Sequence, residues 1–146
     1  MALLVCDADF LIKITNDPLP AFHSLSRKES DFVLATIPLV VRELKGLVFS
    51  KTPKTARRAR NALRSVGQVV NLIGECAEQD ANTEADEALI EFAHRAFQEE
   101  IFVATLDGKL LSKLERTKVP YLTLRNDKPF VRSFSRRATY LTAKNE

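Results

Sequence analysis

The sequence predicts an α/β domain in three layers, with a mainly parallel, Rossmann-like central sheet between two layers of helices. Two observations support this fold class: short apolar runs recur along the chain, and segments with helical spacing of apolar residues separate them. The apolar runs are nearly continuous rather than alternating, which is typical of strands that are buried on both faces. Strands and helices that alternate in this way indicate a parallel sheet covered by helices.

Five apolar runs have the length of a strand and are expected to form the sheet. After the last of them the chain becomes polar and basic, and there one stretch alternates between apolar and polar residues. We expect that stretch, residues 130–134, to form a short edge strand. The five runs cover residues 2–6, 32–36, 69–73, 101–105 and 119–124.

Characteristic residues mark where the helices between these strands begin. Pro38 and Pro53 each stand in the first turn of a helical pattern, where the missing N–H of proline costs nothing. Thr83 begins the next helix, and Asp107 is a favoured N-cap residue for a helix over residues 108–115. In folds of this class, ligands bind beyond the carboxyl ends of the strands.

Length and composition fit one soluble domain. The chain has 146 residues, 45% of them hydrophobic and 28% charged, which excludes disordered and collagen-like proteins. The longest apolar run, 32–41, is about half of what a membrane span needs, and the first residues lack the features of a signal peptide. Two cysteines make neither a disulfide framework nor a zinc site. We therefore expect a cytoplasmic protein without a membrane partner.

The net charge of +3 hides an uneven distribution. Two clusters are basic, while the segment 75–100 is strongly acidic. A single basic cluster could be an ordinary solvated surface, but two of them beside a separate acidic zone favour nucleic acid as a partner. The first cluster contains Lys51, Lys54, Arg57, Arg58, Arg60 and Arg64, and the second contains Arg125, Lys128, Arg132, Arg136 and Arg137.

Several carboxylates stand at strand ends or on apolar helical stripes, where a charged side chain is unusual. Asp7 follows the first predicted strand and Asp107 follows the fourth, so both lie at strand carboxyl ends. Glu43 lies in the middle of an apolar helical stripe, between Leu39 and Leu47, and not on the solvent face. A buried ionised carboxylate is costly unless it is paired or binds a metal.

Asp86 repeats this pattern on the next predicted helix. It aligns with Ile90, Ala93 and Phe97, whereas Glu84 points the other way. An acid in the first turn also suits the helix dipole, so a capping role for Asp86 stays open. An α/β fold would bring all four carboxylates to one edge of the sheet.

Carboxylates gathered at one edge must hold either protons or a cation. Two of them about 4 Å apart repel each other by roughly 4 kcal/mol at an effective dielectric near 20. No cysteine or histidine stands near them at ligand spacing, so the donors are all oxygen atoms. Such a site selects a hard ion, and we expect Mg²⁺ or Mn²⁺.

The four acids stand in the order and the settings found in the PIN-domain nucleases, and the chain resembles that family. The stretches that carry the resemblance are 4–12, 37–44, 85–90, 103–110 and 119–125. The layout is similar to small archaeal PIN proteins related to ribosomal-RNA-processing nucleases and, more distantly, to VapC-type toxins. The resemblance implies a three-layer PIN-like domain over residues 1–125, followed by a basic C-terminal extension over 126–146.

The resemblance also implies roles for individual residues. Thr105 would be the hydroxyl residue that accompanies the last acid. Asp9 departs from the family, which usually has Asn, Ser or Thr there, and a further acid found after the fourth in some members is absent. Asp9 or Glu87 could compensate as an additional ligand. The metal-binding and catalytic acids would be Asp7, Glu43, Asp86 and Asp107.

The function expected from this resemblance is metal-dependent endonucleolytic cleavage of RNA, with ribosomal-RNA processing as a setting. The basic residues would hold the phosphate backbone of single-stranded regions with little regard to sequence. Two alternatives stay open: the toxin of a toxin–antitoxin pair, and a PIN-like RNA-binding scaffold without catalysis. The expected partners are RNA, a second copy of the chain, and an antitoxin or a ribosome-assembly factor.

A second enzyme class shares one motif with this chain. Asp7 and Asp9 have the Asp-x-Asp spacing of the haloacid-dehalogenase-type phosphatases. Phe10 and Leu11 then replace the small residues expected next, and the chain is too short to hold a cap domain. A receiver domain is also disfavoured, because no suitable Asp and Lys follow on the later strands.

Overall fold

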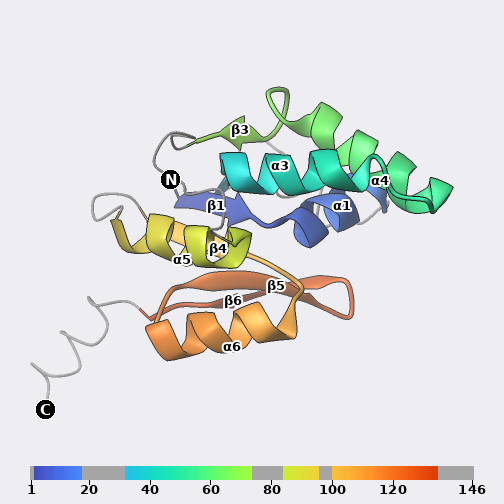
Figure 1. The fold of residues 1–146 in the computed structure, drawn as a ribbon. Helices are drawn as coiled ribbons and strands as arrows, with labels where there is room; N and C mark the ends of the chain where they lie inside the picture. The colour runs from blue at the N-terminus through green and yellow to red at the C-terminus, as the bar shows by residue number, and fades with distance from the viewer. Residues whose placement is uncertain (1, 18–31, 74–83, 96–99, 135–146) are drawn as a thin grey trace, which may run out of the picture.

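Six strands form one sheet in the order β3-β2-β1-β4-β5-β6 (Figure 1). The computed structural model describes residues 2–17, 32–73, 84–95 and 100–134. Strands β1 to β5 pair in parallel, and β6 pairs antiparallel to β5. The strands are β1 (Ala2–Cys6), β2 (Phe32–Thr36), β3 (Asn71–Leu72), β4 (Ile101–Ala104), β5 (Tyr121–Arg125) and β6 (Lys128–Arg132).

The helices begin largely where the sequence predicts. Pro38 and Pro53 stand at the first turns of α3 and α4, and Asp107 is the N-cap of α6. Thr83, which we expected to begin the next helix, lies outside the described residues. The helices are α1 (Ala8–Asn16), α3 (Pro38–Leu47), α4 (Pro53–Ser65), α5 (Ala85–Arg95) and α6 (Gly108–Thr117).

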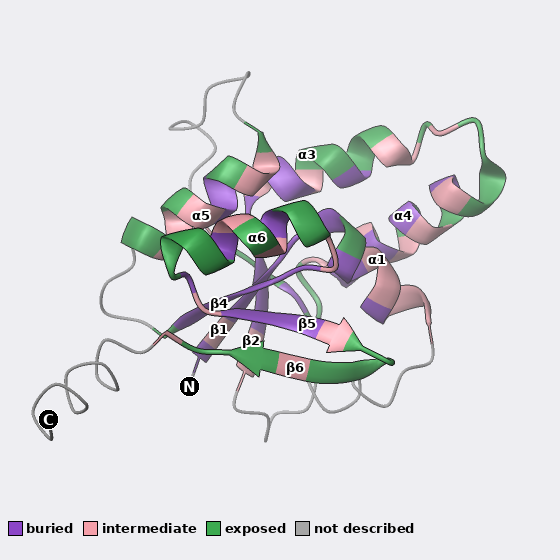
Figure 2. Ribbon diagram, turned by 90° about the horizontal axis from the view of Figure 1, so that it is seen from below, coloured by how far each residue is buried: buried purple, intermediate pink, exposed green. Residues whose placement is uncertain are grey.

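The middle of the sheet is buried and its edges are exposed (Figure 2). All residues of β4 and most of β1 are buried, as their continuous apolar sequences predict. Helices α5 and α6 lie on one face of the sheet, while α1, α3 and α4 pack against one another (Figures 1 and 2). The predicted α/β fold with a mainly parallel central sheet between helices is therefore confirmed.

The edge strands differ somewhat from the predicted ones. The strand expected over 69–73 is reduced to Asn71–Leu72, preceded by an isolated bridge between Val66 and Val70. The strand expected over 130–134 is β6, which spans Lys128–Arg132. The predicted domain boundary at residue 125 thus falls in the hairpin that joins β5 to β6. No helix in the described ranges is both long and apolar enough to cross a bilayer.

Helix α4 owes its position to a stripe of small residues. Ala56, Ala59 and Ala62 are buried at intervals of three residues, and Ser65 continues the stripe. This face packs on α1 and α3, and the short side chains allow a close approach of the three helices. Most of the long basic side chains of α4 are therefore left exposed on its other sides.

Candidate functional site

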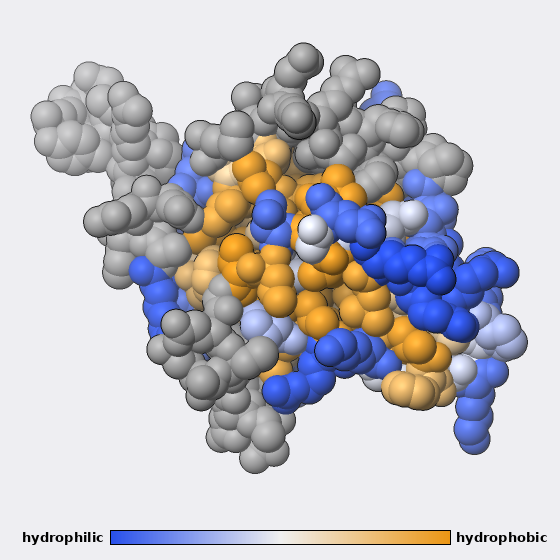
Figure 3. Space-filling view, turned by 90° about the horizontal axis from the view of Figure 1, so that it is seen from above, coloured by the Kyte–Doolittle hydropathy of each residue, from blue (hydrophilic) through white to orange (hydrophobic). Residues whose placement is uncertain are grey.

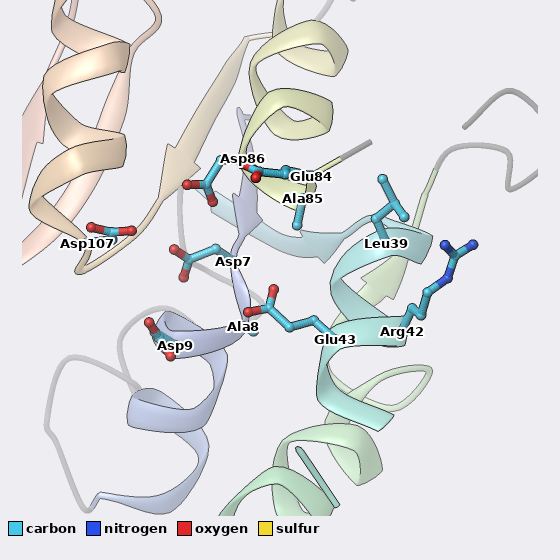
Figure 4. A pocket seen from close by; sticks show the side chains of 10 residues that line it. All are labelled: Asp7, Ala8, Asp9, Leu39, Arg42, Glu43, Glu84, Ala85, Asp86 and Asp107. Atoms are coloured by element: carbon cyan, nitrogen blue, oxygen red, sulfur yellow. The ribbon is translucent and has the colours of Figure 1, made fainter. Parts of the chain in front are cut away.

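A pocket of about 450 Å³ lies at the carboxyl ends of the parallel strands, bordered by the starts of α1, α5 and α6 and by α3. Figure 4 shows that several carboxylates, from different segments of the chain, face one another across it. Parallel strands place their carboxyl ends at a common edge, so residues distant in sequence meet there. The pocket is lined by Asp7, Ala8, Asp9, Leu39, Arg42, Glu43, Glu84, Ala85, Asp86 and Asp107.

Asp7 is the most deeply placed of these carboxylates, with an exposed fraction of 6%. It is the N-cap of α1: one carboxylate oxygen accepts the N–H of Phe10 at 2.8 Å, and the other accepts the hydroxyl of Thr105. Burial raises the pKa of Asp7 to about 7. The two hydrogen bonds oppose this rise, while the charges of Asp9 and Asp86 add to it.

Asp107 stands at the equivalent place after β4. It is the N-cap of α6, and its carboxylate accepts the N–H of Lys109 at 2.9 Å. Its own N–H donates to the hydroxyl of Thr105 at 3.0 Å. Thr105 is buried and therefore joins the two strand-end acids, Asp7 and Asp107, through one hydroxyl group.

Glu43 reaches the pocket from α3, but our expectation that it avoids solvent is wrong. Its helical neighbours Leu39 and Leu44 are buried, whereas Glu43 itself is exposed because it borders an open pocket. The pKa of Glu43 is raised, first by the partial loss of water around its carboxyl group and then by the charges of Asp9 and Asp86. The helical pattern predicts that Glu43 lies on the side of α3 that carries Leu39, but it could not show the open pocket beside it.

Asp86 reaches the same pocket from the first turn of α5. Loss of water raises its pKa, and the negative charge of Asp107 raises it further, whereas Lys113 on α6 lowers it. The alignment with Ile90 and Ala93 is found on α5, and Phe97 lies outside the described residues. Asp86 is thus electrostatically coupled to the other acids of the pocket.

Two pocket residues were missed and one expected extra ligand lies elsewhere. Glu84 was expected to point away from Asp86, but it lines the same pocket, because it precedes α5 and so lies outside its helical geometry. Arg42 also lines the rim, and Figure 4 shows its guanidinium pointing away from the carboxylates. Asp9 lines the pocket as well, whereas Glu87 is exposed on α5 and does not.

Among solved structures, the chain is similar to the PIN domain endonuclease Utp24, with a TM-score of 0.66 and 20% sequence identity. The match covers 90% of this chain and 92% of the other. The chain has the fold of a PIN domain. No protein-family model and no curated protein sequence matches it. At this level of identity the likeness is one of fold.

The donor set of this PIN fold suits a hard divalent cation. Every candidate ligand is a carboxylate oxygen, and the acids raise one another's pKa, as expected of groups that share a cation site. In the described part of the chain, no three such side chains already stand in a metal-coordinating arrangement. The four-acid metal site therefore stays a prediction, although the structure brings all four acids to one pocket.

The first basic cluster lies on α4 and on the turn before it. Figure 3, which looks down on the side that carries β3 and α4, shows hydrophilic residues gathered at the α4 end. Arg58 is an exception, since it is partly buried and pairs with Asp17 at 2.9 Å across the contact between α4 and α1. The exposed members are Lys51, Lys54, Arg57, Arg60 and Arg64.

The second basic cluster lies on the β5–β6 hairpin. The guanidinium of Arg125 stacks on the ring of Phe130 at 3.7 Å, and that of Arg132 lies over Phe134 at 4.6 Å. Arg132 also pairs with Glu115 at 3.1 Å. Arg136 and Arg137 lie outside the described residues. Part of this cluster therefore has internal partners, which makes it a weaker candidate for phosphate binding than the cluster at α4.

Proposed function

We propose that this chain is a divalent-metal-dependent endoribonuclease. The observation that carries the proposal is the convergence of four carboxylates on one pocket of a PIN fold: two follow β1 and β4, and the other two belong to α3 and α5. The pKa of three of them is raised, so the site favours whatever neutralises its charge. RNA, and ribosomal RNA in particular, follows from the sequence resemblance described above and belongs to the proposal.

In the proposed site the acids divide into fixed and adjustable ligands. Asp7 and Asp107 each accept a backbone N–H as the N-cap of a helix, and Thr105 hydrogen-bonds to both residues. Because these bonds hold them in place, they would be direct ligands. Glu43 and Asp86 would bind directly or through water. Bound Mg²⁺ or Mn²⁺ would supply an activated water nucleophile at neutral pH and neutralise charge on the leaving oxygen.

The chain's own residues would position the substrate. Arg42 lies at the rim of the pocket, turned away from the acids, and can contact a phosphate that enters there. The exposed lysines and arginines of α4 would hold the backbone beyond the rim, which makes binding strong at low salt and weak at high salt. The hydroxyl of Thr105 and the N–H of Phe10 would hold the carboxylate of Asp7 in place, because both donate hydrogen bonds to it.

The test is cleavage of a labelled single-stranded RNA with Mn²⁺ by the native chain, Asp7→Asn and Asp127→Asn. Asparagine can still cap α1, so Asp7→Asn removes the charge with little effect on the fold. Its activity should fall by about 100-fold or more, because losing even a partner of a metal ligand costs up to about 100-fold. Asp127 is 64% exposed and lies in the β5–β6 turn, so Asp127→Asn should cleave like the native chain.

Metal binding gives an independent measure of the same site. Calorimetric titration with Mn²⁺ should show binding to the native chain and to Asp127→Asn, and much weaker binding to Asp7→Asn. Cleavage that is equal in the native chain and in Asp7→Asn would leave the proposed mechanism without support. RNA binding without any cleavage or any need for Mn²⁺ would instead indicate a non-catalytic scaffold.

A further inference from the structure

Phe49 is a large aromatic residue with almost no cover. Its exposed fraction is 86%, the highest of the large exposed hydrophobic residues among those described. It lies two residues after the end of α3, in the connection to α4. A single exposed apolar residue is ordinary on a protein surface, so what it means depends on what surrounds it.

Phe49 continues a stripe of residues that begins at the acidic pocket. Arg42, Gly46 and Phe49 are four and three residues apart, the spacing that places residues on one side of a helix. Helical geometry persists past the end of α3, because Val48 has αR angles and its N–H donates to the carbonyl of Leu44 at 3.2 Å. All three stripe residues are exposed, and we call them the α3 strip. The strip runs about 10 Å from the pocket rim to the ring.

Gly46 leaves the middle of the α3 strip without a side chain. Glycine inside a helix is destabilising relative to alanine, so its presence usually has a reason. A Cβ atom added at Gly46 would meet no other atom within 4 Å, so packing within the chain does not require glycine there. The free space lies outside the helix, where the backbone of a ligand can approach closely.

The surface next to Phe49 is basic. Lys51, Lys54 and Arg57 follow within eight residues and are all exposed, and no acid occurs from residue 51 to residue 64. Basic side chains that bind phosphates, next to an aromatic ring on which a base can stack, are the two elements of single-strand recognition. A duplex would offer phosphates but no open base face to the ring.

We propose that the α3 strip leads single-stranded RNA into the acidic pocket, with one base stacked on Phe49 and its phosphates on Arg42 and the neighbouring lysines. The ribose-phosphate backbone passes over Gly46. This inference rests on the proposed nuclease function and deepens it: the strand is single, and the base on Phe49 lies one or a few nucleotides from the bond that is cut.

A protein partner is the other class of occupant that an exposed aromatic ring suits. Such a partner would have to match the ring with an apolar surface. Next to Phe49, however, the exposed residues of the connection and of the start of α4 are polar or basic except for Pro53, which favours a polyanion. A second copy of this chain would also place two basic surfaces against each other.

The test is binding of a fluorescein-labelled RNA in EDTA, where cleavage does not interfere, measured by anisotropy with single-stranded and hairpin probes. Phe49→Ala should weaken single-strand binding by about 5- to 150-fold, the range expected for one base–aromatic stack. Phe49→Tyr should keep the native affinity. The matched control is Leu72→Ala, because Leu72 is also exposed, at 52%, but belongs to β3 and not to the α3 strip.

Gly46→Ala and a fluorescent base give two readouts that a purely structural role would not move. Gly46→Ala should raise the melting temperature, since alanine is the better helix former, and yet weaken binding of the single strand. RNA with 2-aminopurine at successive positions should show quenching at one position with the native chain. That quenching should be lost with Phe49→Ala.

The possible outcomes separate this inference from the nuclease proposal. If Phe49→Ala and Gly46→Ala bind single-stranded RNA as the native chain does, the inference is overturned, even where cleavage is intact. It is equally overturned if Phe49→Ala changes the oligomeric state in analytical ultracentrifugation without changing RNA affinity. If the strip variants lose binding but the native chain cleaves no RNA, the α3 strip is a single-strand binding site and the nuclease proposal fails, together with the statement about the bond that is cut.

Discussion

At the scale of single residues, Thr105 connects the two acids that follow parallel strands. Its hydroxyl accepts the N–H of Asp107 at 3.0 Å, so its one proton is left for the carboxylate of Asp7. A hydrogen bond donated to a carboxylate favours the charged form and lowers the pKa. Thr105 therefore opposes the effect of burial on Asp7 and keeps this carboxylate within reach of ionisation near neutral pH.

Thr105→Val should shift the pH dependence of cleavage to higher pH. Valine keeps the shape of threonine but removes the donor, so the pKa of Asp7 rises further. A hydrogen bond to a charged group contributes about 1.5–3 kcal/mol, which corresponds to a shift of about 1–2 pH units. Cleavage rates measured from pH 5.5 to 9 (roughly the span in which Asp7 titrates) should show this shift.

Thr105→Ser is the control for that experiment, because serine keeps the hydroxyl and should keep the native profile. A native pH profile in Thr105→Val would mean that Asp7 is not the group whose ionisation limits the rate. Loss of folding in Thr105→Val, seen by circular dichroism, would be distinguished by comparing the rates at high pH. There the native and variant chains should converge.

At the scale of elements, α4 combines a structural face with an outer basic face. Arg58 points to α1, where Asp17 pairs with it and also with Lys13 at 2.6 Å. These two cations, Lys13 first, hold the pKa of Asp17 at about 2. Arg57, the preceding residue, is exposed on the outer face. Adjacent arginines of the same cluster therefore have different surroundings.

Arg57→Ala and Arg58→Ala should affect different properties: the first should change RNA binding and the second the stability of the fold. Arg57→Ala should weaken RNA binding and reduce the slope of log K against log salt by about 0.7, the value for one phosphate contact with a single strand. Arg58→Ala should lower the melting temperature by about 2–4 °C, as expected for an ion pair worth up to about 1 kcal/mol, with little change in that slope. Salt-dependent anisotropy and thermal unfolding of both variants check this, and equal slopes would contradict it.

At the scale of the whole molecule, the sequence predicts the parallel sheet well because its strands are buried on both faces. Continuous apolar runs such as 2–6 and 32–36 are stable only when both of their faces are buried, as in the middle of a covered sheet. Both are strands in the structure. The short edge strand β3 was overestimated, because its residues Asn71 and Leu72 are exposed and depend on pairing with β2 rather than on burial.

The site could be predicted only for residues whose position is set by the regular geometry of a strand or a helix. Asp7 and Asp107 follow strands, and Glu43 and Asp86 follow helical spacing, so their convergence was foreseeable. Glu84 was not, because it lies just before α5, where helical periodicity does not apply. The partly buried ion pair of Arg58 was also invisible in sequence, since its partner on α1 comes close only through the packing of two helices.

The acidic pocket also couples the stability of the whole fold to pH and to metal ions. The pKa of Asp7 rises from 3.8 to about 7 on folding, so between these values the folded chain holds a proton that the unfolded chain has released. The stabilisation from this proton is complete below about pH 4 and is lost as the pH rises through 7. A divalent ion bound at neutral pH replaces the proton and stabilises the folded state by mass action.

The melting temperature of the metal-free chain should therefore contain a contribution that falls between pH 4 and pH 7. At pH 7.5, Mn²⁺ at about 100 times its dissociation constant should restore roughly 2.7 kcal/mol of stability, or several degrees. Asp7→Asn cannot titrate at this position, so both the fall with pH and the gain with Mn²⁺ should shrink, while Asp127→Asn should behave as the native chain.

Scanning calorimetry from pH 4.5 to 8 (about the window between the two pKa values) checks this. Because the unfolded chains of Asp7→Asn and of the native protein differ by only one carboxyl group, the difference between their two curves isolates Asp7. Curves that run parallel across the whole range, with and without Mn²⁺, would show that Asp7 neither holds a proton in the folded chain nor takes part in binding the metal.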